Sequence, residues 1–432
     1  MRAIGFGQNT PVARILAQTG IGPLMTAMTP ALALQVARSH LLRSEFDAAE
    51  RLCRRVLELA PDQGRAWYLM GALAFERGDA LSAVESLARA IELEPSEQEY
   101  YGYLKLVMAE SGREQEALQV EARARREKEF TARFGQLPRE IQGYQRFVDS
   151  LRETRYLQYP REVVIETIAL CNAACSFCPY PVLDRKGEKM PDELIAKIIG
   201  DLTDVPRDLP IWISPFKLSD PLLDVRLLDI LADINHRLPN ARLRLFTNGS
   251  PLTEKKLAGI ARVKQLEHLW ISLNHHEKQG YEQIMKLPWE RSLERLDMVH
   301  RKKASGEFPL PVIVSRVGDG GDEDAAFLRF VRERFPLFQA ALVSRTEWLG
   351  QLPGLTAAGK INPVGCARWF ELSIMATGLV AFCCMDAQGR YPIGDVRSSH
   401  VLEVYNAPTY RMYRERIDTR MEAMPCRMCS NL

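Results

Sequence analysis

Apolar residues recur every three to four positions over the first third of the chain, and in short runs of four to seven residues after it. Within residues 31–130 this helical pattern is interrupted at a fixed interval, because Pro61 and Pro95 lie 34 positions apart. The same interval separates Ala49, Ala83 and Ala117. A repeat of this length predicts stacked helix pairs, each burying its apolar face against the next. A generic helical bundle has the same periodicity, but the coincident spacings favour repeats.

The middle repeat carries a recognisable set of small and aromatic residues. The stretch 65–95 reads RAWYLMGALAFERGDALSAVESLARAIELEP and places Trp67, Gly71, Ala83, Ala90 and Pro95 at the signature positions of a known repeat. In this respect the region resembles tetratricopeptide repeats. The resemblance implies a concave surface for a peptide, carrier or partner protein, or else a packing or oligomerisation module.

A different pattern begins near residue 159, after a polar helical connector expected at 131–158. Strand-like apolar runs alternate with helical segments, and this alternation predicts an α/β fold with a parallel sheet. Six strands are expected, at 162–168, 210–214, 242–247, 267–273, 310–317 and 340–345. Ligands of such sheets bind at the carboxyl ends of the strands. From residue 360 onward the chain looks irregular, with too little periodic structure to be stable without an additional cross-link.

Composition excludes several classes of function. The 57 basic and 55 acidic residues leave a net charge of +2, which gives no reason to expect a nucleic acid or a membrane surface as partner. No apolar run approaches the ~20 residues of a membrane helix, and Gly, Asn, Gln and Pro break the first 30 residues before any signal-peptide core develops. A cytoplasmic location is the default, in which the nine cysteines are thiols, metal ligands or catalytic groups.

Three of those cysteines form a tight group directly after the first predicted strand. The sequence CNAACSFCP places Cys171, Cys175 and Cys178 in one loop. A four-iron cluster normally takes four protein thiolates, so three would leave one iron open for a substrate or cofactor. Structural zinc is a weaker alternative, because such zinc is usually closed by four ligands and the nearest histidine is His236. Cys53, alone in a helical pattern, is expected to be a buried apolar residue.

The Cys-x3-Cys-x2-Cys loop, with the aromatic Phe177 before its last cysteine, resembles the motif of the radical S-adenosylmethionine (radical SAM) superfamily. The resemblance covers residues 160–432 and implies a partial (β/α)6 TIM-like barrel. It also implies that the three cysteines hold a 4Fe-4S cluster whose open iron binds S-adenosylmethionine. One electron, from a donor such as flavodoxin or ferredoxin, would cleave the cofactor to a deoxyadenosyl radical that abstracts hydrogen from a substrate carbon.

Further segments resemble the cofactor contacts of that family. FTNGS at 246–250 and WISLN at 270–274 resemble its third and fourth strand ends. The resemblance implies cofactor contacts from Phe177, Thr247, Asn248, Ser272 and Asn274. The second strand departs from the family, since Leu218, Ser219 and Asp220 replace the usual Gly-Gly-Glu that holds the methionyl amine. Ser219 and Asp220 are the expected substitutes.

A second cysteine group lies near the chain end. Cys366, Cys383, Cys426 and Cys429, with Gly378 and the stretch YPIGDV at 391–396 between them, resemble the auxiliary-cluster domain of the SPASM and twitch subfamilies. The resemblance implies one fully ligated auxiliary 4Fe-4S cluster, in the shortened twitch arrangement. Cys384 could replace Cys383, and a four-cysteine zinc site is the competing interpretation. Arg368 and Trp369 are expected to pack this domain.

The predicted domains are an N-terminal segment (1–30), helical repeats (31–130), a connector (131–158), a radical SAM core (159–350) and an auxiliary domain (360–432). A closed auxiliary cluster suits electron transfer, so oxidation or coupling of a natural product, sugar or peptide is expected. No catalytic side chain is distinctive. The candidates for proton transfer are Lys217, Arg316, Arg345, Glu347, His275 and His276, although the two histidines are more simply exposed turn residues. The alternative is a non-catalytic iron–sulfur sensor or repeat-bearing adaptor.

Overall fold

The computed structural model describes residues 28–351 and 363–429, in two compact units, Met1–Pro138 and Arg139–Leu432. The N-terminal segment predicted at 1–30 lies almost entirely outside the described residues. Each unit has its own apolar core and is described by itself. Among the described helices, none combines the length and the apolar character needed to cross a bilayer.

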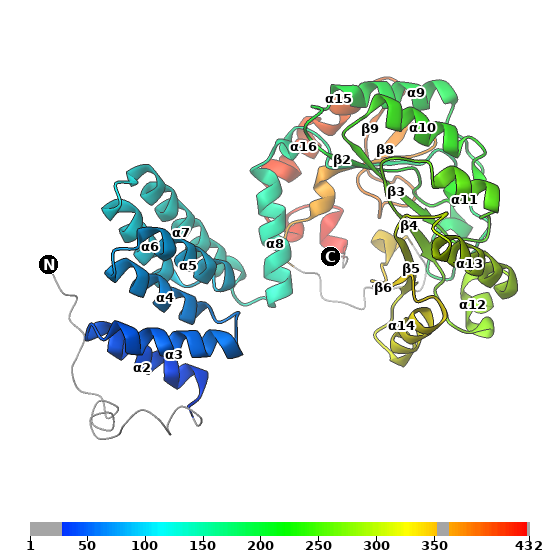
Figure 1. Ribbon diagram of the computed structural model, residues 1–432. Coiled ribbons are helices and arrows are strands. Elements are labelled where there is room, and N and C mark those ends of the chain that lie inside the picture. The colour runs from blue at the N-terminus through cyan, green and yellow to red at the C-terminus, as the bar shows by residue number, and fades with distance from the viewer. Residues whose placement is uncertain (1–27, 352–362, 430–432) are drawn as a thin grey trace. The chain divides into compact units, whose positions relative to one another are not determined.

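The first unit consists of helical repeats. Its helices are α2 (Pro30–Leu42), α3 (Phe46–Leu59), α4 (Gly64–Glu76), α5 (Ala80–Leu93), α6 (Gln98–Glu110) and α7 (Glu114–Phe134). Consecutive helices pack as pairs, α2 with α3, α4 with α5 and α6 with α7 (Figure 1). The recurring alanines are buried, and a Cβ on Gly71 would lie 2.7 Å from Leu87 Cγ. Small residues recur because they let paired helices approach closely.

The second unit is built on one nine-stranded sheet, in the order β6-β5-β4-β3-β2-β1-β7-β8-β9. The six predicted strands are present as β1 (Glu162–Ile165), β2 (Ile211–Ser214), β3 (Ala241–Thr247), β4 (Leu266–Ser272), β5 (Val312–Val317) and β6 (Gln339–Val343). All six run parallel, in register with their neighbours along the chain. The α/β architecture predicted from the sequence is therefore confirmed, and the carboxyl ends of these strands share one edge.

Helices cover the outer face of this curved sheet, as Figure 1 shows for α9 to α13. These helices and α14 are α9 (Asp192–Asp201), α10 (Leu227–Arg237), α11 (Glu254–Ile260), α12 (Lys278–Met285), α13 (Trp289–Ala304) and α14 (Asp322–Arg334). Alternate strand residues such as Ile213, Leu243 and Ile271 pack beneath them. The intervening residues Ser214, Phe246 and Trp270 therefore face the inner side.

The expectation of an irregular C-terminal region was wrong. The chain forms β7 (Glu371–Ile374), β8 (Leu379–Ala381) and β9 (Pro392–Asp395), followed by α15 (Val401–Tyr405) and α16 (Pro408–Glu415). Strand β7 pairs in parallel with β1, and β8 and β9 continue the sheet antiparallel. All four residues of β7 are buried, Glu371 and Ser373 included, although the sequence Glu-Leu-Ser-Ile alternates polar and apolar residues as a half-buried strand would.

Helix α8 (Arg139–Arg152) falls in the second unit rather than between the units. Val148 and Leu151 belong to the apolar core of that unit, and the Gln145 side chain accepts a hydrogen bond from the Gly365 amide at 2.6 Å. Arg152 also forms an ion pair with Asp418 at 2.9 Å. The helix thus packs against the C-terminal region, next to the second cysteine group.

Candidate functional site

A cavity of about 480 Å³ opens at the carboxyl ends of the parallel strands, and it is called the barrel cavity below. Its volume lies within the range typical of small-molecule sites, about 300–1,000 Å³. Its lining includes the residues for which the sequence predicts cluster or cofactor contacts: Cys171, Cys175, Cys178, Phe177, Ser219, Asp220, Thr247, Asn248, Ser272 and Asn274. Residues from the ends of four strands, more than a hundred positions apart, therefore meet around one space.

The three-cysteine loop is anchored by the end of α12. The amides of Ala174 and Ser176 donate to the carbonyls of Met285 and Ile284, at 3.1 and 3.0 Å. Burial raises the pKa of Cys171 to about 12, although a hydrogen bond from the Ala173 amide opposes this shift.

Burial also raises the pKa of Cys178, to about 11. Three half-buried sulfurs that resist ionisation need a cation to become thiolates. This donor set suits an iron cluster, which supplies positive charge to three sulfurs at once.

Asp220 is fully engaged with the surrounding loops. Its Oδ2 accepts the Asn248 amide and the Thr247 hydroxyl, both at 2.8 Å, and its Oδ1 accepts the Leu222 amide at 3.1 Å. Burial raises the pKa of this carboxyl, while these hydrogen bonds oppose the shift. The Ser219 hydroxyl beside it is buried without a hydrogen-bond partner and lines the cavity. Asp220 therefore ties the β2 and β3 ends together, and Ser219 has the uncommitted oxygen.

A buried ion pair that the sequence did not reveal holds one part of the cavity wall, at Leu218. Glu166, the residue that follows β1, accepts from Arg185 at 2.7 and 2.9 Å. The same carboxylate accepts the amides of Leu218 and Ala376, at 3.3 and 3.2 Å. Because Glu166 is completely buried, these four donors stabilise a charge that would otherwise be costly. They join the cysteine loop, the β2 end and the C-terminal region.

Three aromatic side chains form one wall of the barrel cavity: Phe216, Phe246 and Trp270. The ring centroids of Phe216 and Phe246 lie 4.7 Å apart, and those of Phe246 and Trp270 lie 5.5 Å apart, each pair inclined by 33°. Sequence reasoning did not single them out. The signal was available, because Phe246 and Trp270 each precede a predicted contact residue by two positions, and such residues share one face of a strand.

Lys217 connects the barrel cavity to the C-terminal region. Its ammonium group donates to the Ser373 hydroxyl at 2.8 Å and to the carbonyls of Cys383 and Cys384 at 3.1 and 3.4 Å. Burial lowers the pKa of Lys217, although nearby thiols and carboxylates oppose the shift. An ammonium has three donors, and three acceptors surround it here.

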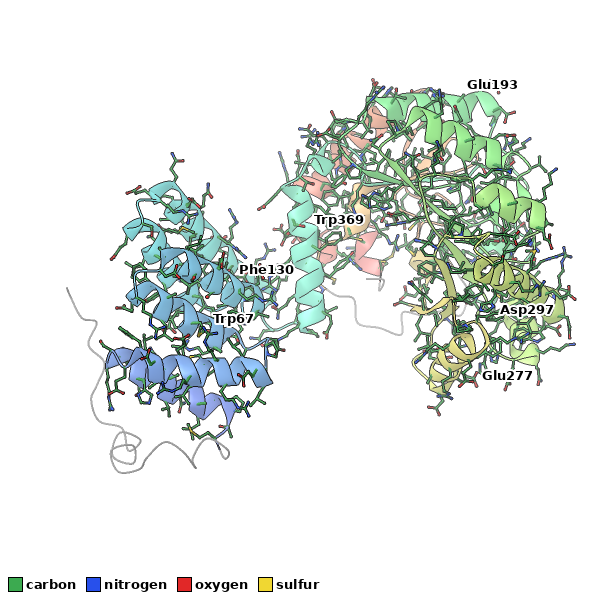
Figure 2. The ribbon with its side chains drawn as sticks, viewed as in Figure 1. Trp67, Phe130, Glu193, Glu277, Asp297 and Trp369 are labelled. Atoms are coloured by element: carbon green, nitrogen blue, oxygen red, sulfur yellow. The ribbon has the colours of Figure 1, made fainter. Side chains whose placement is uncertain are left out.

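The second cysteine group also converges. Cys366, Cys383, Cys426 and Cys429 line one small cavity, called the cysteine cavity below. Burial raises the pKa of Cys426 to about 12, although the Trp369 indole, which donates to its sulfur at 3.3 Å, opposes this. Trp369 is almost fully buried, within the second unit (Figure 2). Four thiols around one space form a closed set of ligands for a cluster or a metal ion.

Cys384 does not belong to the lining of the cysteine cavity. Its sulfur lies 2.6 Å from Arg368 Nη1, and the same guanidinium lies 3.3 Å from Glu371 Oε2. Of the two adjacent cysteines that the sequence left open, Cys383 is therefore the one placed with the other three.

Comparison with known proteins agrees with both cysteine groups. A family model described as the radical SAM superfamily matches residues 165–332, and a model described as an iron-sulfur cluster-binding domain (SPASM) matches residues 366–430. The chain therefore contains a radical SAM domain followed by a SPASM domain. Its radical SAM core includes the first cysteine group, and its SPASM domain includes the second.

Three solved structures are similar to this radical SAM chain. BtrN in complex with AdoMet and 2-DOIA is 17% identical, with a TM-score of 0.43, and the match covers 63% of this chain and 93% of that one. Streptococcus suis SuiB bound to precursor peptide SuiA is 13% identical, with a TM-score of 0.49 over 77% and 86% of the two chains. Native anSMEcpe with bound AdoMet and Cp18Cys peptide is 10% identical, with a TM-score of 0.46 over 62% and 87%. The search of curated proteins returned no match.

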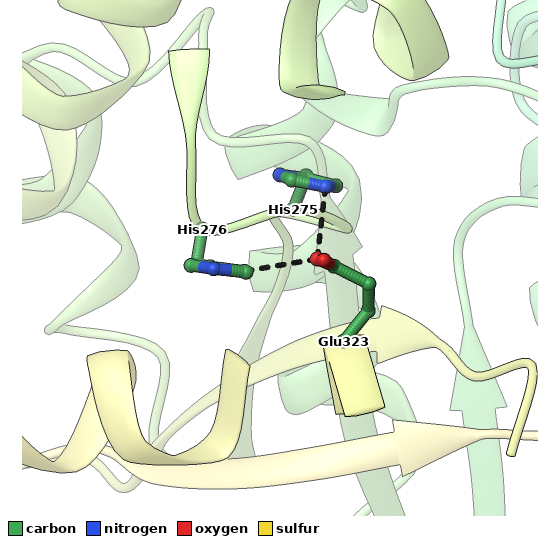
Figure 3. A group of neighbouring side chains, drawn as sticks. All are labelled: His275, His276 and Glu323. Atoms are coloured by element: carbon green, nitrogen blue, oxygen red, sulfur yellow. Dashed lines mark ion pairs between the residues drawn. The ribbon is translucent and has the colours of Figure 1, made fainter. Parts of the chain in front are cut away.

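The tandem histidines of the radical SAM core are not exposed, which corrects one expectation. The side chains of His275 and His276 are 13% and 15% exposed, and their rings stack with centroids 4.9 Å apart. Figure 3 shows both directed at Glu323, whose Oε2 lies 3.2 Å from His275 Nε2. The Glu277 amide donates to His275 Nδ1, so the neutral ring carries its proton on Nε2, the nitrogen that faces Glu323.

Most of the other proton-transfer candidates also lie away from the cavity lining. Arg316 is buried and paired with Asp324 at 2.7 Å, Arg345 is exposed, and Glu347 is buried outside the lining. Lys217 is the one sequence-derived candidate among the described lining residues.

Proposed function

We propose that this protein is a radical SAM oxidoreductase or coupling enzyme, in which a substrate held in the barrel cavity is attacked by a radical derived from S-adenosylmethionine. The observation that carries the proposal is the convergence of three cysteines and seven polar or aromatic contact residues on one cavity, beside a second cavity lined by four cysteines. A binding module would need neither set of clustered thiols.

In this proposal Cys171, Cys175 and Cys178 hold a 4Fe-4S cluster. Phe177, Ser219, Thr247, Asn248, Ser272 and Asn274 contact S-adenosylmethionine. Ser219 offers its uncommitted hydroxyl to the cofactor amine, and Asp220 positions the residues around it through the Asn248 amide and the Thr247 hydroxyl. When bound, the cluster and cofactor together supply a deoxyadenosyl radical that removes hydrogen from a substrate carbon.

The four residues Cys366, Cys383, Cys426 and Cys429 hold one auxiliary 4Fe-4S cluster in this proposal. With every iron ligated by protein, such a cluster would supply electron transfer, by taking up the electron that a substrate radical loses when it is oxidised or coupled. Lys217 lines the barrel cavity and hydrogen-bonds the backbone of Cys383, so it places the two sites in a fixed relation. The indole of Trp369 and the thiol-facing guanidinium of Arg368 shield the cysteine cavity.

The expected partners follow from this chemistry. A low-potential donor such as flavodoxin or ferredoxin supplies the electron, and a reducing cytoplasm keeps the nine unpaired cysteines available. The helical unit, as a set of tetratricopeptide-like repeats, binds a substrate peptide, a carrier protein or another protein. Neither a nucleic acid nor a membrane partner is expected.

A non-catalytic iron–sulfur sensor or adaptor is the second candidate. It is favoured by one observation, the engagement of Asp220 with three neighbours where the family has a glutamate that binds the cofactor. An adaptor would take up iron but would neither bind nor cleave S-adenosylmethionine.

The deciding experiment is anaerobic reconstitution with iron and sulfide, followed by iron analysis and by a deoxyadenosine assay with dithionite and S-adenosylmethionine. Two four-iron clusters predict about eight irons per chain together with deoxyadenosine. Cys175→Ala should abolish deoxyadenosine formation. Cys53→Ala, which changes a buried cysteine of the helical unit, is the matched control and should not. About four irons with no deoxyadenosine would instead support the adaptor.

A further inference from the structure

We propose that the substrate group admitted to the barrel cavity is a planar aromatic one rather than a sugar or an aliphatic chain. The inference rests on the proposed function and goes further by naming the class of substrate. This class is inferred from the part of the cavity wall that provides neither cluster ligands nor predicted cofactor contacts.

That remaining wall is apolar and aromatic. Phe216, Phe246 and Trp270 come from the ends of three adjacent strands, and Trp348 lines the cavity from the loop after β6. The first three rings form one inclined stack, with centroids 4.7 and 5.5 Å apart. Aromatic rings prefer such offset arrangements, at centroid separations of about 4.5–7 Å. A planar group can extend this stack into the cavity.

The polar groups of the same wall are already used within the protein. Asp220, the one carboxylate among the described lining residues, accepts three donors, and Lys217 donates to three acceptors. The Trp270 indole donates to the Ser315 hydroxyl at 2.7 Å, and the Trp348 indole donates to the Phe177 carbonyl at 3.0 Å. The aromatic wall therefore offers few free partners to a ligand.

This distribution disfavours polyhydroxylated and amino sugars. A hydroxyl that leaves water without a new partner costs about 1–3 kcal/mol, and a sugar would place several against this wall. An ammonium group would find no carboxylate free to pair with it. Entry of an aromatic ring requires no such desolvation and removes apolar surface of the three rings from water.

The ring stack also distinguishes an aromatic group from an aliphatic one. Aromatic pairs contribute about 0.5–1.5 kcal/mol beyond the burial of their area, which an aliphatic side chain of similar size does not gain. This preference corresponds to roughly two- to tenfold in affinity. The expected substrate therefore presents an aromatic side chain or ring to the cofactor.

Binding of three probes tests the proposal. The anaerobically reconstituted protein with S-adenosylmethionine present is titrated, by calorimetry or saturation-transfer NMR, with N-acetyl-L-tryptophanamide, N-acetyl-L-leucinamide and glucosamine. The tryptophan probe should bind at least about twofold more tightly than the leucine probe, and glucosamine should not bind measurably. Equal binding of the two amides, tighter binding of glucosamine, or no binding of any probe would overturn the proposal.

Variants of the aromatic wall test whether the tryptophan probe binds against it. Trp270→Leu and Phe246→Leu should weaken the tryptophan probe several-fold, whereas Trp270→Phe should retain most of its affinity. Trp67→Leu makes the same change in the helical unit, where the indole donates to the Pro61 carbonyl, and should leave probe binding unaltered. Unchanged binding in both wall variants would overturn the proposal. Deoxyadenosine formation is measured on the same samples, so that failure of the proposed function, which abolishes the nucleoside, is distinguishable from failure of this inference, which does not.

Discussion

Lys217 Nζ donates a hydrogen bond of 2.8 Å to Ser373 Oγ, and this contact joins the end of β2 to the middle of β7. The two residues lie 156 positions apart, in the radical SAM core and in the C-terminal SPASM domain. The same ammonium holds the backbone at Cys383 and Cys384. One buried lysine therefore links the walls of the two candidate cluster sites.

Replacing this lysine should weaken the link. Lys217→Met leaves the Ser373 hydroxyl and the Cys383 carbonyl buried without their donor, so the free energy of unfolding should fall by about 1–3 kcal/mol. Lys217→Gln retains a donor and should lose less. Chemical denaturation followed by fluorescence checks both, with Lys278→Met, at an exposed lysine, as the control. A Lys217→Met variant as stable as the wild type would contradict the anchoring role.

Asp220 should affect cofactor binding by holding its neighbours in place. In Asp220→Asn one oxygen becomes an amide nitrogen that faces the donors of Asn248, Thr247 and Leu222, so the affinity for S-adenosylmethionine should fall by roughly tenfold, or about 1.4 kcal/mol. Ser219→Ala removes a single hydroxyl and should cost about 0.5–1.5 kcal/mol. Anaerobic calorimetry measures both. The control is Asp208→Asn, at an exposed carboxylate paired with Arg155.

The result of the serine variant separates two roles. If Ser219→Ala weakens the cofactor and Asp220→Asn does not, the carboxylate has no positioning role. If neither variant changes the affinity, the β2 end is not a cofactor contact.

The adjacent cysteines 383 and 384 should differ in iron retention. Cys383→Ser removes a sulfur from the cysteine cavity and should lower the iron content from about eight to about four per chain. Cys384→Ser changes a sulfur that lies against Arg368 and should retain about eight. Iron analysis and electron paramagnetic resonance after reconstitution check the prediction, and the reverse pattern would assign the ligand to Cys384.

The base of the barrel should make stability depend on pH. Burial, and after it the neighbouring Glu371, raise the pKa of Glu162 from 4.5 to about 7. The folded state therefore holds this proton more tightly than the unfolded state. The protonated carboxyl contributes to the free energy of unfolding below pH 4.5, and this contribution is lost as the pH rises through about 7.

Glu162→Gln should remove this dependence. Between about pH 4.5 and pH 7 the wild type should lose up to about 3 kcal/mol relative to the variant. Denaturation curves at several pH values compare the two proteins, and Glu193→Gln, at an exposed glutamate of α9 labelled in Figure 2, serves as the control. Parallel stability curves for wild type and Glu162→Gln would contradict the raised pKa.

The sequence by itself determined the features that depend on local pattern. The spacing of Pro61 and Pro95 predicted helical repeats, and six apolar runs predicted the parallel strands, because the period of buried residues is set within each element. The loop from Cys171 to Cys178 carries its own spacing, so its chemistry could be recognised without the fold. Strand β7 alternates polar and apolar residues over only four positions, too short a run to stand out, and its pairing with the distant β1 leaves no local signal.

Only the tertiary structure decided which distant groups meet. Asp220 was expected to face the cofactor, but its partners Thr247 and Asn248 lie on another strand, and no local pattern reveals a hydrogen bond across the sheet. Cys383 and Cys384 are adjacent in sequence, but Cys383 lines the cysteine cavity whereas the Cys384 sulfur lies against Arg368. The aromatic wall likewise joins three strands. Such contacts depend on the register of elements far apart in the chain, and that register exists only once the common core has formed.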